Sequence, residues 1–269
     1  MDTKDPAQIF NTLLEHLVPH RYSWTPTWKI GPIDLSPTNA VINIWAAAIL
    51  VIVIFVVATS KPRLVPKGLQ NMIEVALNFV REQIVDAVMK PADAKAWFPF
   101  IAAIFFFIFM MNVLELVPYA GFTPTSNIFA TAALAILVYL LAVAVGMARH
   151  GPARFWARTL VPPGLPGKGI MKGVTVGFFI LIETISQLAR PFSLAVRLFA
   201  NMLADHVILL IFIGFMFLAS GVLLVVMVPV SLALEVVFTF FVLFVDFIQA
   251  VIFAFLSTIY LNDALHPGH

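Results

Sequence analysis

The fold is decided by one stretch of the chain, Arg190-Pro-Phe-Ser-Leu-Ala-Val-Arg-Leu-Phe-Ala-Asn-Met-Leu-Ala-Asp-His206. It places two arginines, an asparagine, an aspartate and a histidine inside an otherwise apolar run from about Val174 to Ser220. A charged side chain at the centre of a bilayer costs about 2.5–3.5 kcal/mol on insertion scales, so such residues usually have charged partners along an ion path. The stretch therefore predicts a membrane protein that moves ions.

The composition of the whole chain agrees with this interpretation. Hydrophobic residues make up 61% of the 269 positions and charged residues only 11%, with a mean hydropathy of +1.00. Soluble domains contain about 25% charged residues, so the chain is expected to cross a membrane several times. The absence of cysteine excludes disulfides and thiolate metal sites. The net charge of +2 is too small to favour a nucleic-acid partner.

Five apolar runs are long enough to cross a bilayer, which takes about 20 residues. We expect an all-α integral membrane fold, a single domain over residues 39–261, with spans at about 39–60, 97–116, 128–147, 174–218 and 222–261. Between the first two spans, apolar residues recur every three or four positions over about residues 69–89. This spacing is typical of an amphipathic helix lying on the membrane surface. A further short helix is expected from Pro6 to Leu17 in the polar segment 1–38.

The distribution of basic residues predicts the orientation of the spans. The segments after the first and third spans are rich in basic residues and contain Lys61, Arg63, Lys67, Arg149, Arg154, Arg158, Lys168 and Lys172. The loop 117–127 contains no lysine or arginine. Because basic loops stay on the cytoplasmic side, segment 1–38 is expected to be external and the tail 262–269 cytoplasmic.

The last two apolar runs are unusually long. As helices they would measure about 67 Å and about 60 Å, whereas the hydrocarbon core is about 30 Å thick. Each run is therefore either one strongly tilted helix or two tightly joined spans, with kinks expected at Pro191 and Pro229. The residues alone leave both alternatives open.

Polar side chains form a stripe along each long run. At about 100° per residue, one stripe lies within about 120° and contains Glu183, Arg190, Ser193, Arg197, Asn201 and Asp205. His206 projects to another side. In the last run, a face within about 60° contains Glu235, Asp246 and Gln249. Two such helices can meet and line a path.

Four motifs carry a resemblance to a known family. They are Ser193-Leu-Ala-Val-Arg197-Leu-Phe-Ala-Asn-Met202, Phe247-Ile-Gln249-Ala-Val-Ile-Phe253, Ser257-Thr-Ile-Tyr-Leu261 and Asn112-Val-Leu-Glu-Leu-Val-Pro118. Together they resemble subunit a of rotary F-type ATP synthases over most of residues 39–261. The resemblance implies a non-catalytic subunit without a cofactor or metal, in a bacterial plasma (inner) membrane. It also implies a hairpin of two tilted helices against a ring of c subunits, with subunit b of the peripheral stalk and other synthase subunits as partners.

The resemblance also implies roles for individual residues in proton transport. Arg197 would face a carboxylate of the ring and separate two half-channels, with Ser193, Asn201 and Gln249 nearby. The inlet half-channel, from the external side, would contain Glu115, Asp205, His206 and Asp246. The outlet half-channel, toward the cytoplasm, would contain Glu183 and Arg190. The choice of protons rather than sodium ions follows the commoner habit of the family.

Several of these residues can instead have a purely structural role. Arg190 can instead bond carbonyl groups that a kink at Pro191 frees, or lie at the cytoplasmic interface. Asn201 and Gln249 can join helices through hydrogen bonds worth about 0.6 kcal/mol each. Glu115 and Glu183 can be ordinary carboxylates near helix ends.

The partner of His206 departs from the family pattern. Family members place an acid seven residues before the glutamine, where this chain has Val242. Asp246 or Asp205 can take its place as the partner of His206.

Other classes of protein fit the sequence less well. A secondary transporter would contain inverted repeats, and none is evident. A scaffold without transport leaves Arg197 unexplained. An enzyme is disfavoured because Gly164-Leu-Pro-Gly-Lys-Gly169 lacks the spacing of a phosphate-binding loop and no His-Glu-x-x-His motif is present.

Overall fold

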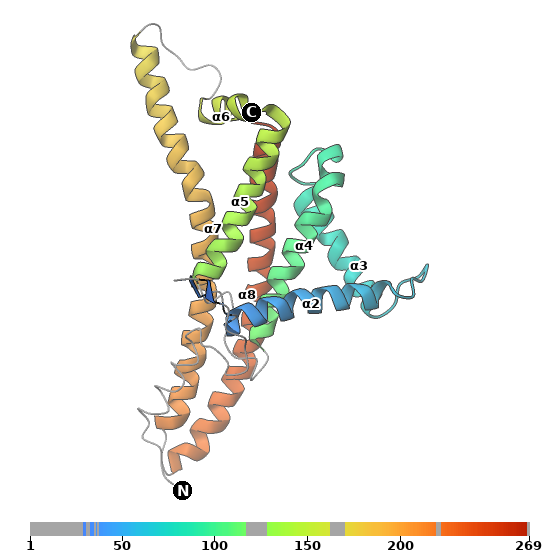
Figure 1. Ribbon diagram of the computed structural model, residues 1–269. Coiled ribbons are helices and arrows are strands. Elements are labelled where there is room, and N and C mark those ends of the chain that lie inside the picture. The colour runs from blue at the N-terminus through green and yellow to red at the C-terminus, as the bar shows by residue number, and fades with distance from the viewer. Residues whose placement is uncertain are drawn as a thin grey trace. The chain divides into compact units, whose positions relative to one another are not determined.

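The computed structural model describes residues 29–30, 33–34, 36, 38–116, 128–161, 170–218 and 222–267, and these residues are mainly helical (Figure 1). The helix expected at Pro6–Leu17 and the loop 117–127 lie outside the described residues. Two strands that the sequence did not predict, β1 (Lys29–Ile30) and β2 (Ile33–Asp34), pair antiparallel with Lys29 opposite Asp34.

Among the described residues, five helices are long and apolar enough to cross a membrane. They are α2 (Asn39–Thr59), α4 (Pro91–Glu115), α5 (Ile128–His150), α7 (Ile170–Leu218) and α8 (Val222–Leu265). This result confirms the predicted fold class. Helix α4 begins six residues before the expected position 97, because Pro91 suits the first position of a helix and the charged Asp93 suits its first turn.

The two long runs are single uninterrupted helices. Helix α7 contains 49 residues and α8 contains 44, with Pro191 and Pro229 inside them. Neither run is divided into two joined spans. Pro191 has no N–H to donate to the carbonyl group of Gln187 four residues earlier, so that carbonyl loses its helical bond. Spanning helices tolerate such a proline because neighbouring groups or water satisfy the freed carbonyl.

Two shorter helices lie between the spans. The predicted amphipathic segment forms α3 (Leu69–Phe79), which continues as a π-helix, η1 (Val80–Val85). Its apolar positions Ile73, Val80 and Ile84 are buried. Helix α6 (Pro152–Leu160), which we did not predict, follows Gly151, whose φ of 79° favours glycine between two helices.

The chain divides into two compact units. Unit 1 comprises Met1–Ile73, Phe106–Ala130 and Leu198–Ala250. Aromatic contacts join its segments: the rings of Phe55 and Phe106 lie edge to face with centroids 4.9 Å apart. The rings of Phe109 and Phe247 do the same at 6.0 Å, so α4 and α8 pack together in this unit.

Unit 2 comprises Glu74–Phe105, Thr131–Arg197 and Val251–His269. The buried face of α5 consists of mostly small residues at helical spacing, Thr131, Ala135, Val138, Ala142 and Gly146. Small residues allow spanning helices to approach closely. The hydroxyl groups of Ser257 and Thr258 on α8 are buried and donate to the carbonyl groups of Phe253 and Ala254, at 2.7 and 2.8 Å. Their polar groups are thus satisfied within the helix.

Gly146 marks the closest approach within unit 2. A Cβ atom added there would collide with the ring of Phe155 on α6 and lie 3.0 Å from the carbonyl oxygen of Ala264 on α8. Three helices therefore meet at a position where only a hydrogen atom fits.

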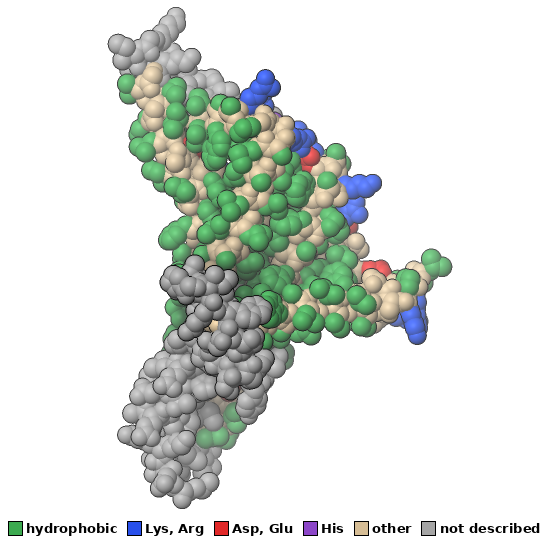
Figure 2. Space-filling model, in the orientation of Figure 1, with side chains coloured by type: hydrophobic (Ala, Val, Ile, Leu, Met, Phe, Trp, Pro, Cys, Tyr) green, Lys and Arg blue, Asp and Glu red, His purple; other side chains and the backbone are tan. Residues whose placement is uncertain are grey.

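Large hydrophobic side chains cover the described helices in the view of Figure 2. Phe192 on α7 and Phe240 on α8 are about 70% exposed, as are many other aliphatic and aromatic residues of the spans. Apolar surface of this extent marks contact with lipid or with partner proteins.

Candidate functional site

Arg197 lies on an exposed face of α7. Its side chain and that of Ser193 are exposed, whereas Leu194 and Leu198 are almost completely buried. Within the described part of the chain, Arg197 has no hydrogen-bond or ion-pair partner. A guanidinium stays charged at any physiological pH. The arginine is therefore a permanent charge on a mainly apolar helix.

Unit 2 contains a cavity of about 490 Å³. This volume is enough for several waters, since one water occupies about 30 Å³ in the liquid. Helices α5, α6, α7 and α8 and the residues after α8 form its walls. Its charged and polar lining includes Arg158, Glu183, Gln187, Arg190, Asp263 and His266.

Arg190 is held in this cavity by two groups of α8. Its Nη1 donates to Oδ2 of Asp263 at 2.8 Å, and its guanidinium carbon lies 5.3 Å from the centre of the Tyr260 ring. A charge-assisted hydrogen bond and a cation–π contact both favour the charged arginine. Arg190 thus bonds a carboxylate, where one structural alternative had it bond the carbonyl groups freed at Pro191.

Glu183 lines the same cavity two turns earlier on α7. Its Oε1 accepts a hydrogen bond from Nε2 of Gln187 at 2.9 Å. The seven residues between Glu183 and Arg190 correspond to about 10 Å along the helix axis. The structure therefore brings both predicted outlet residues to one cavity that is large enough for several waters.

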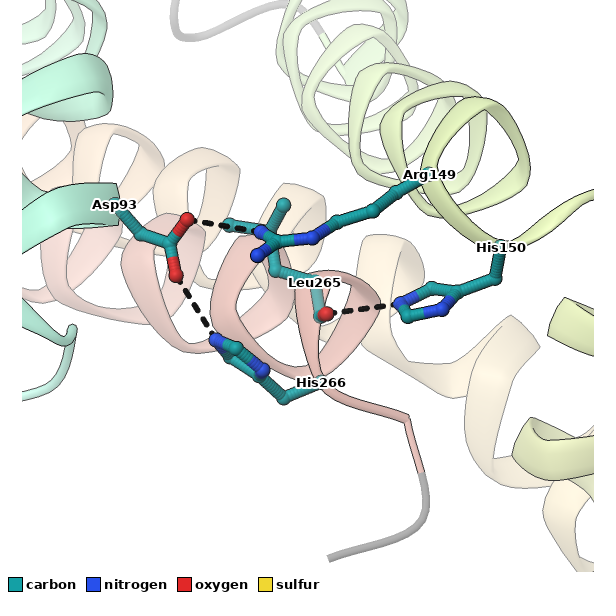
Figure 3. Close-up of polar contacts among 5 residues, drawn as sticks. All are labelled: Asp93, Arg149, His150, Leu265 and His266. Atoms are coloured by element: carbon teal, nitrogen blue, oxygen red, sulfur yellow. Dashed lines mark hydrogen bonds and ion pairs between the residues drawn. The ribbon is translucent and has the colours of Figure 1, made fainter.

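A cluster of polar contacts fixes the end of α8 beside the cavity (Figure 3). Asp93 accepts a hydrogen bond from Nη1 of Arg149 at 2.8 Å and lies 2.9 Å from Nε2 of His266. His150 Nε2 lies 2.9 Å from the carbonyl oxygen of Leu265. That oxygen can only accept, so Nε2 of His150 carries the proton. The cluster joins the start of α4, the end of α5 and the last turn of α8.

The polar residues of unit 1 are more deeply buried. Asp246 and Asn112 are 0% exposed and Gln249 is 5% exposed. The buried amide nitrogens of Asn112, Asn201 and Gln249 find no hydrogen-bond partner among the described residues. A buried amide without a partner costs about 1–3 kcal/mol, and water usually satisfies such groups. These amides indicate a polar region suited to water.

Three predicted inlet residues, Glu115, Asp205 and His206, have side chains outside the described residues. Their roles, and the choice of an acid partner for His206, stay predictions. Of the predicted inlet group, the structure describes the side chain of Asp246, which occupies the buried face of α8 one turn beyond Val242.

Several residues of these sites were not predicted from the sequence. Asp263 was assigned to the tail because the last apolar run was taken to end at residue 261, although α8 continues to Leu265. The sequence did offer a clue to Asp263: only five acidic residues occur after residue 174, and Arg190 needs one of them as a counterion. Asn112 was quoted only as part of a motif, although an asparagine in the middle of an apolar run is itself a signal.

Comparisons with known proteins identify the family. The family model described as ATP synthase A chain matches residues 41–262. ATP synthase subunit a of Beijerinckia indica is 36% identical over 98% of this chain and 97% of the relative. The corresponding subunits of a Chelativorans species and of Pelagibacter ubique are 40% and 36% identical, over 90% and 92% of this chain and 93% and 96% of their own lengths. With five helices suited to cross a membrane, the chain belongs to the ATP synthase subunit a family as a multi-pass membrane protein.

Proposed function

We propose that the chain is the proton-translocating stator subunit of a bacterial F-type ATP synthase and that Arg197 separates its two half-channels. Membership of the family places the chain in the membrane sector of the synthase, where proton transport is coupled to ATP synthesis. The proposal adds the path within the subunit. Protons enter an inlet half-channel from the external side, ride on a rotating ring of c subunits, and leave to the cytoplasm through an outlet half-channel.

One observation carries the proposal: Arg197 is an exposed, permanent charge with no partner among the described residues of its own chain. A carboxylate of the c-ring that faces the arginine would supply that partner. The guanidinium favours the ionised form of such a carboxylate, so each ring carboxylate gives up its proton before it passes. The fixed positive charge also opposes direct proton flow between the half-channels.

The cavity of unit 2 supports the outlet half-channel. It is polar and wide enough for water, and it is lined by both Glu183 and Arg190. Glu183 supplies a carboxylate that can accept a proton from the ring and release it to water. The basic residues Arg149 and Arg158, at the end of α5 and in α6, support a cytoplasmic location for this end of the unit.

The buried polar groups of unit 1 support the inlet half-channel. Asn201 and Gln249 offer amide nitrogens that suit water, and Asp246 is a carboxylate on the same helix as Gln249. We assign Glu115, Asp205 and His206 to this path with Asp246, by the family resemblance. The N-terminus is then external and the C-terminus cytoplasmic, with subunit b and other synthase subunits as partners beside the c-ring.

Coupling proton transport to rotation requires only a modest change in the free energy of proton binding to the ring carboxylate. A membrane potential supplies about 2.3 kcal/mol per charge per 100 mV, and a shift of one pKa unit corresponds to about 1.4 kcal/mol. Changing the pKa of the ring carboxylate by between one and two units therefore suffices to couple proton binding to rotation.

Arg197→Ala tests the proposal. We expect it to abolish both ATP synthesis and ATP-driven proton pumping in inverted vesicles while the synthase still assembles, because no neutral side chain can separate the half-channels. Arg197→Lys should also fail, since a lysine can lose its proton beside the ring. Arg154→Ala, at an exposed position of α6, is the control and should pump normally. Coupled pumping near the wild-type rate in Arg197→Ala would refute the role of the arginine.

A further inference from the structure

We infer that Asp263 is a specificity-determining residue of the cavity in unit 2: its carboxylate cancels the charge of Arg190 and so keeps the cavity permeable to protons. The inference rests on the proposed function, in which this cavity is the outlet half-channel. Neither the family resemblance nor the residue roles it implies include Asp263.

Among the described residues that line the cavity, the guanidinium and carboxylate charges balance only when Asp263 is counted. Arg158 and Arg190 contribute two positive charges, and Glu183 and Asp263 contribute two negative charges. The imidazole of His266 is paired with Asp93, outside the cavity lining. Without Asp263 the lining would carry a net positive charge. Asp263 is also the acid in direct contact with Arg190, at 2.8 Å.

Arg190 can neither lose its positive charge nor move it out of the cavity. Its guanidinium does not lose its proton, and the Tyr260 ring at 5.3 Å holds it against the cavity wall. Its side chain is about 24% exposed, so water screens it only in part. Clefts with apolar walls focus the field of one sign of charge. An uncompensated arginine would therefore repel protons and hydronium ions from the cavity.

Three variants separate charge balance from a purely structural role. In inverted vesicles, ATP-driven pumping takes protons from the medium through this cavity. We expect Asp263→Asn, which keeps the shape and removes the charge, to pump about tenfold more slowly. Asp263→Glu should retain most of the rate. The double variant Arg190→Gln with Asp263→Asn should recover to within about threefold of the wild type, because the net charge returns to zero.

Salt provides a second readout. The defect of Asp263→Asn should shrink as the ionic strength rises, because salt screens the partly exposed Arg190. A merely structural defect would not respond in this way. Asp86→Asn is the matched control, since Asp86 forms an exposed ion pair with Arg81 at 3.7 Å and neither residue lines the cavity. It should pump normally at every salt concentration.

Glu183→Gln distinguishes failure of this inference from failure of the proposed function. If Glu183→Gln pumps slowly while Asp263→Asn pumps normally, the cavity is the outlet and the role of Asp263 is refuted. If Glu183→Gln pumps normally, the cavity is not the outlet, and both statements fall. A double variant that stays as slow as Asp263→Asn would also overturn the inference, because charge balance predicts recovery.

Discussion

Gly146 sits where three helices meet, and replacing it should loosen unit 2. In Gly146→Ala the new methyl group would collide with the Phe155 ring and press on the carbonyl oxygen of Ala264 at 3.0 Å. The ring can turn aside, but the carbonyl belongs to the backbone of α8 and cannot move without the helix. We therefore expect the end of α8 to shift away from α5, which would lengthen the His150 to Leu265 bond.

The size of this effect follows from two opposing contributions. Forcing an extra methyl group into a packed core costs about 1–3 kcal/mol. Alanine is favoured over glycine in a helix by about 1 kcal/mol. The expected net loss of stability is about 1 kcal/mol, or about 2–4 °C in the unfolding temperature of a domain of this size. Phe155 and Ala264 also line the cavity, so proton pumping should fall with it.

The assay compares two glycines. The temperature at which the subunit aggregates in detergent-purified synthase is measured for Gly146→Ala and for Gly177→Ala. Gly177 lies in α7, and apart from its chain neighbours and the backbone of its own helix no atom of the described residues lies within 4 Å of an added Cβ, so its alanine variant should be unchanged or slightly more stable. If both variants aggregate at the same temperature as the wild type, the close packing at Gly146 is not what holds these helices together.

Two further predictions concern topology and the inlet. Because the chain has no cysteine, Arg154→Cys and Phe122→Cys should react with a membrane-impermeant thiol reagent from the cytoplasmic and external sides respectively; reaction of both from one side would refute the five-crossing orientation. If Asp246 is the acid of the inlet, Asp246→Asn should slow proton uptake and shift the pH dependence of ATP synthesis, and adding Val242→Glu should restore part of the rate. A pH profile identical to the wild type in assembled Asp246→Asn would leave Asp246 with a structural role only.

The fold was largely predictable because membrane spans depend on long-range averages of hydrophobicity. Runs of about 20 apolar residues are unfavourable in water, so each apolar run was evident from the residues alone. Whether each of the last two runs was one helix or two spans was not, and only the structure shows one helix for each. Helix ends were less predictable. The first turn of α4, with Pro91 and the charged Asp93, extends that helix beyond its long apolar run, and the nine-residue helix α6 has no long apolar run to mark it.

The residues of the candidate site were likewise predictable only in part. Arg197, Glu183 and Arg190 were conspicuous because charges are rare in apolar runs. Their neighbours were not, because contacts such as Arg190 with Asp263 join positions 73 residues apart. Asp93 and Arg149 come from two different helices and His266 follows the end of a third, and no periodicity within one helix can reveal such a cluster. Pairing across helices depends on packing that a single sequence does not state.

Because α7 is one unbroken helix, it fixes the spacing between the residues along it. Glu183 and Arg197 are separated by 14 residues on one continuous helix, a spacing of about 21 Å with the two positions about 40° apart around the axis. No loop between them can absorb an added or deleted residue. One inserted residue would turn Arg197 by about 100° relative to Glu183. The number of residues between Glu183 and Arg197 therefore sets both their distance and their angle around the helix axis, and lengthening or shortening this segment alters both together.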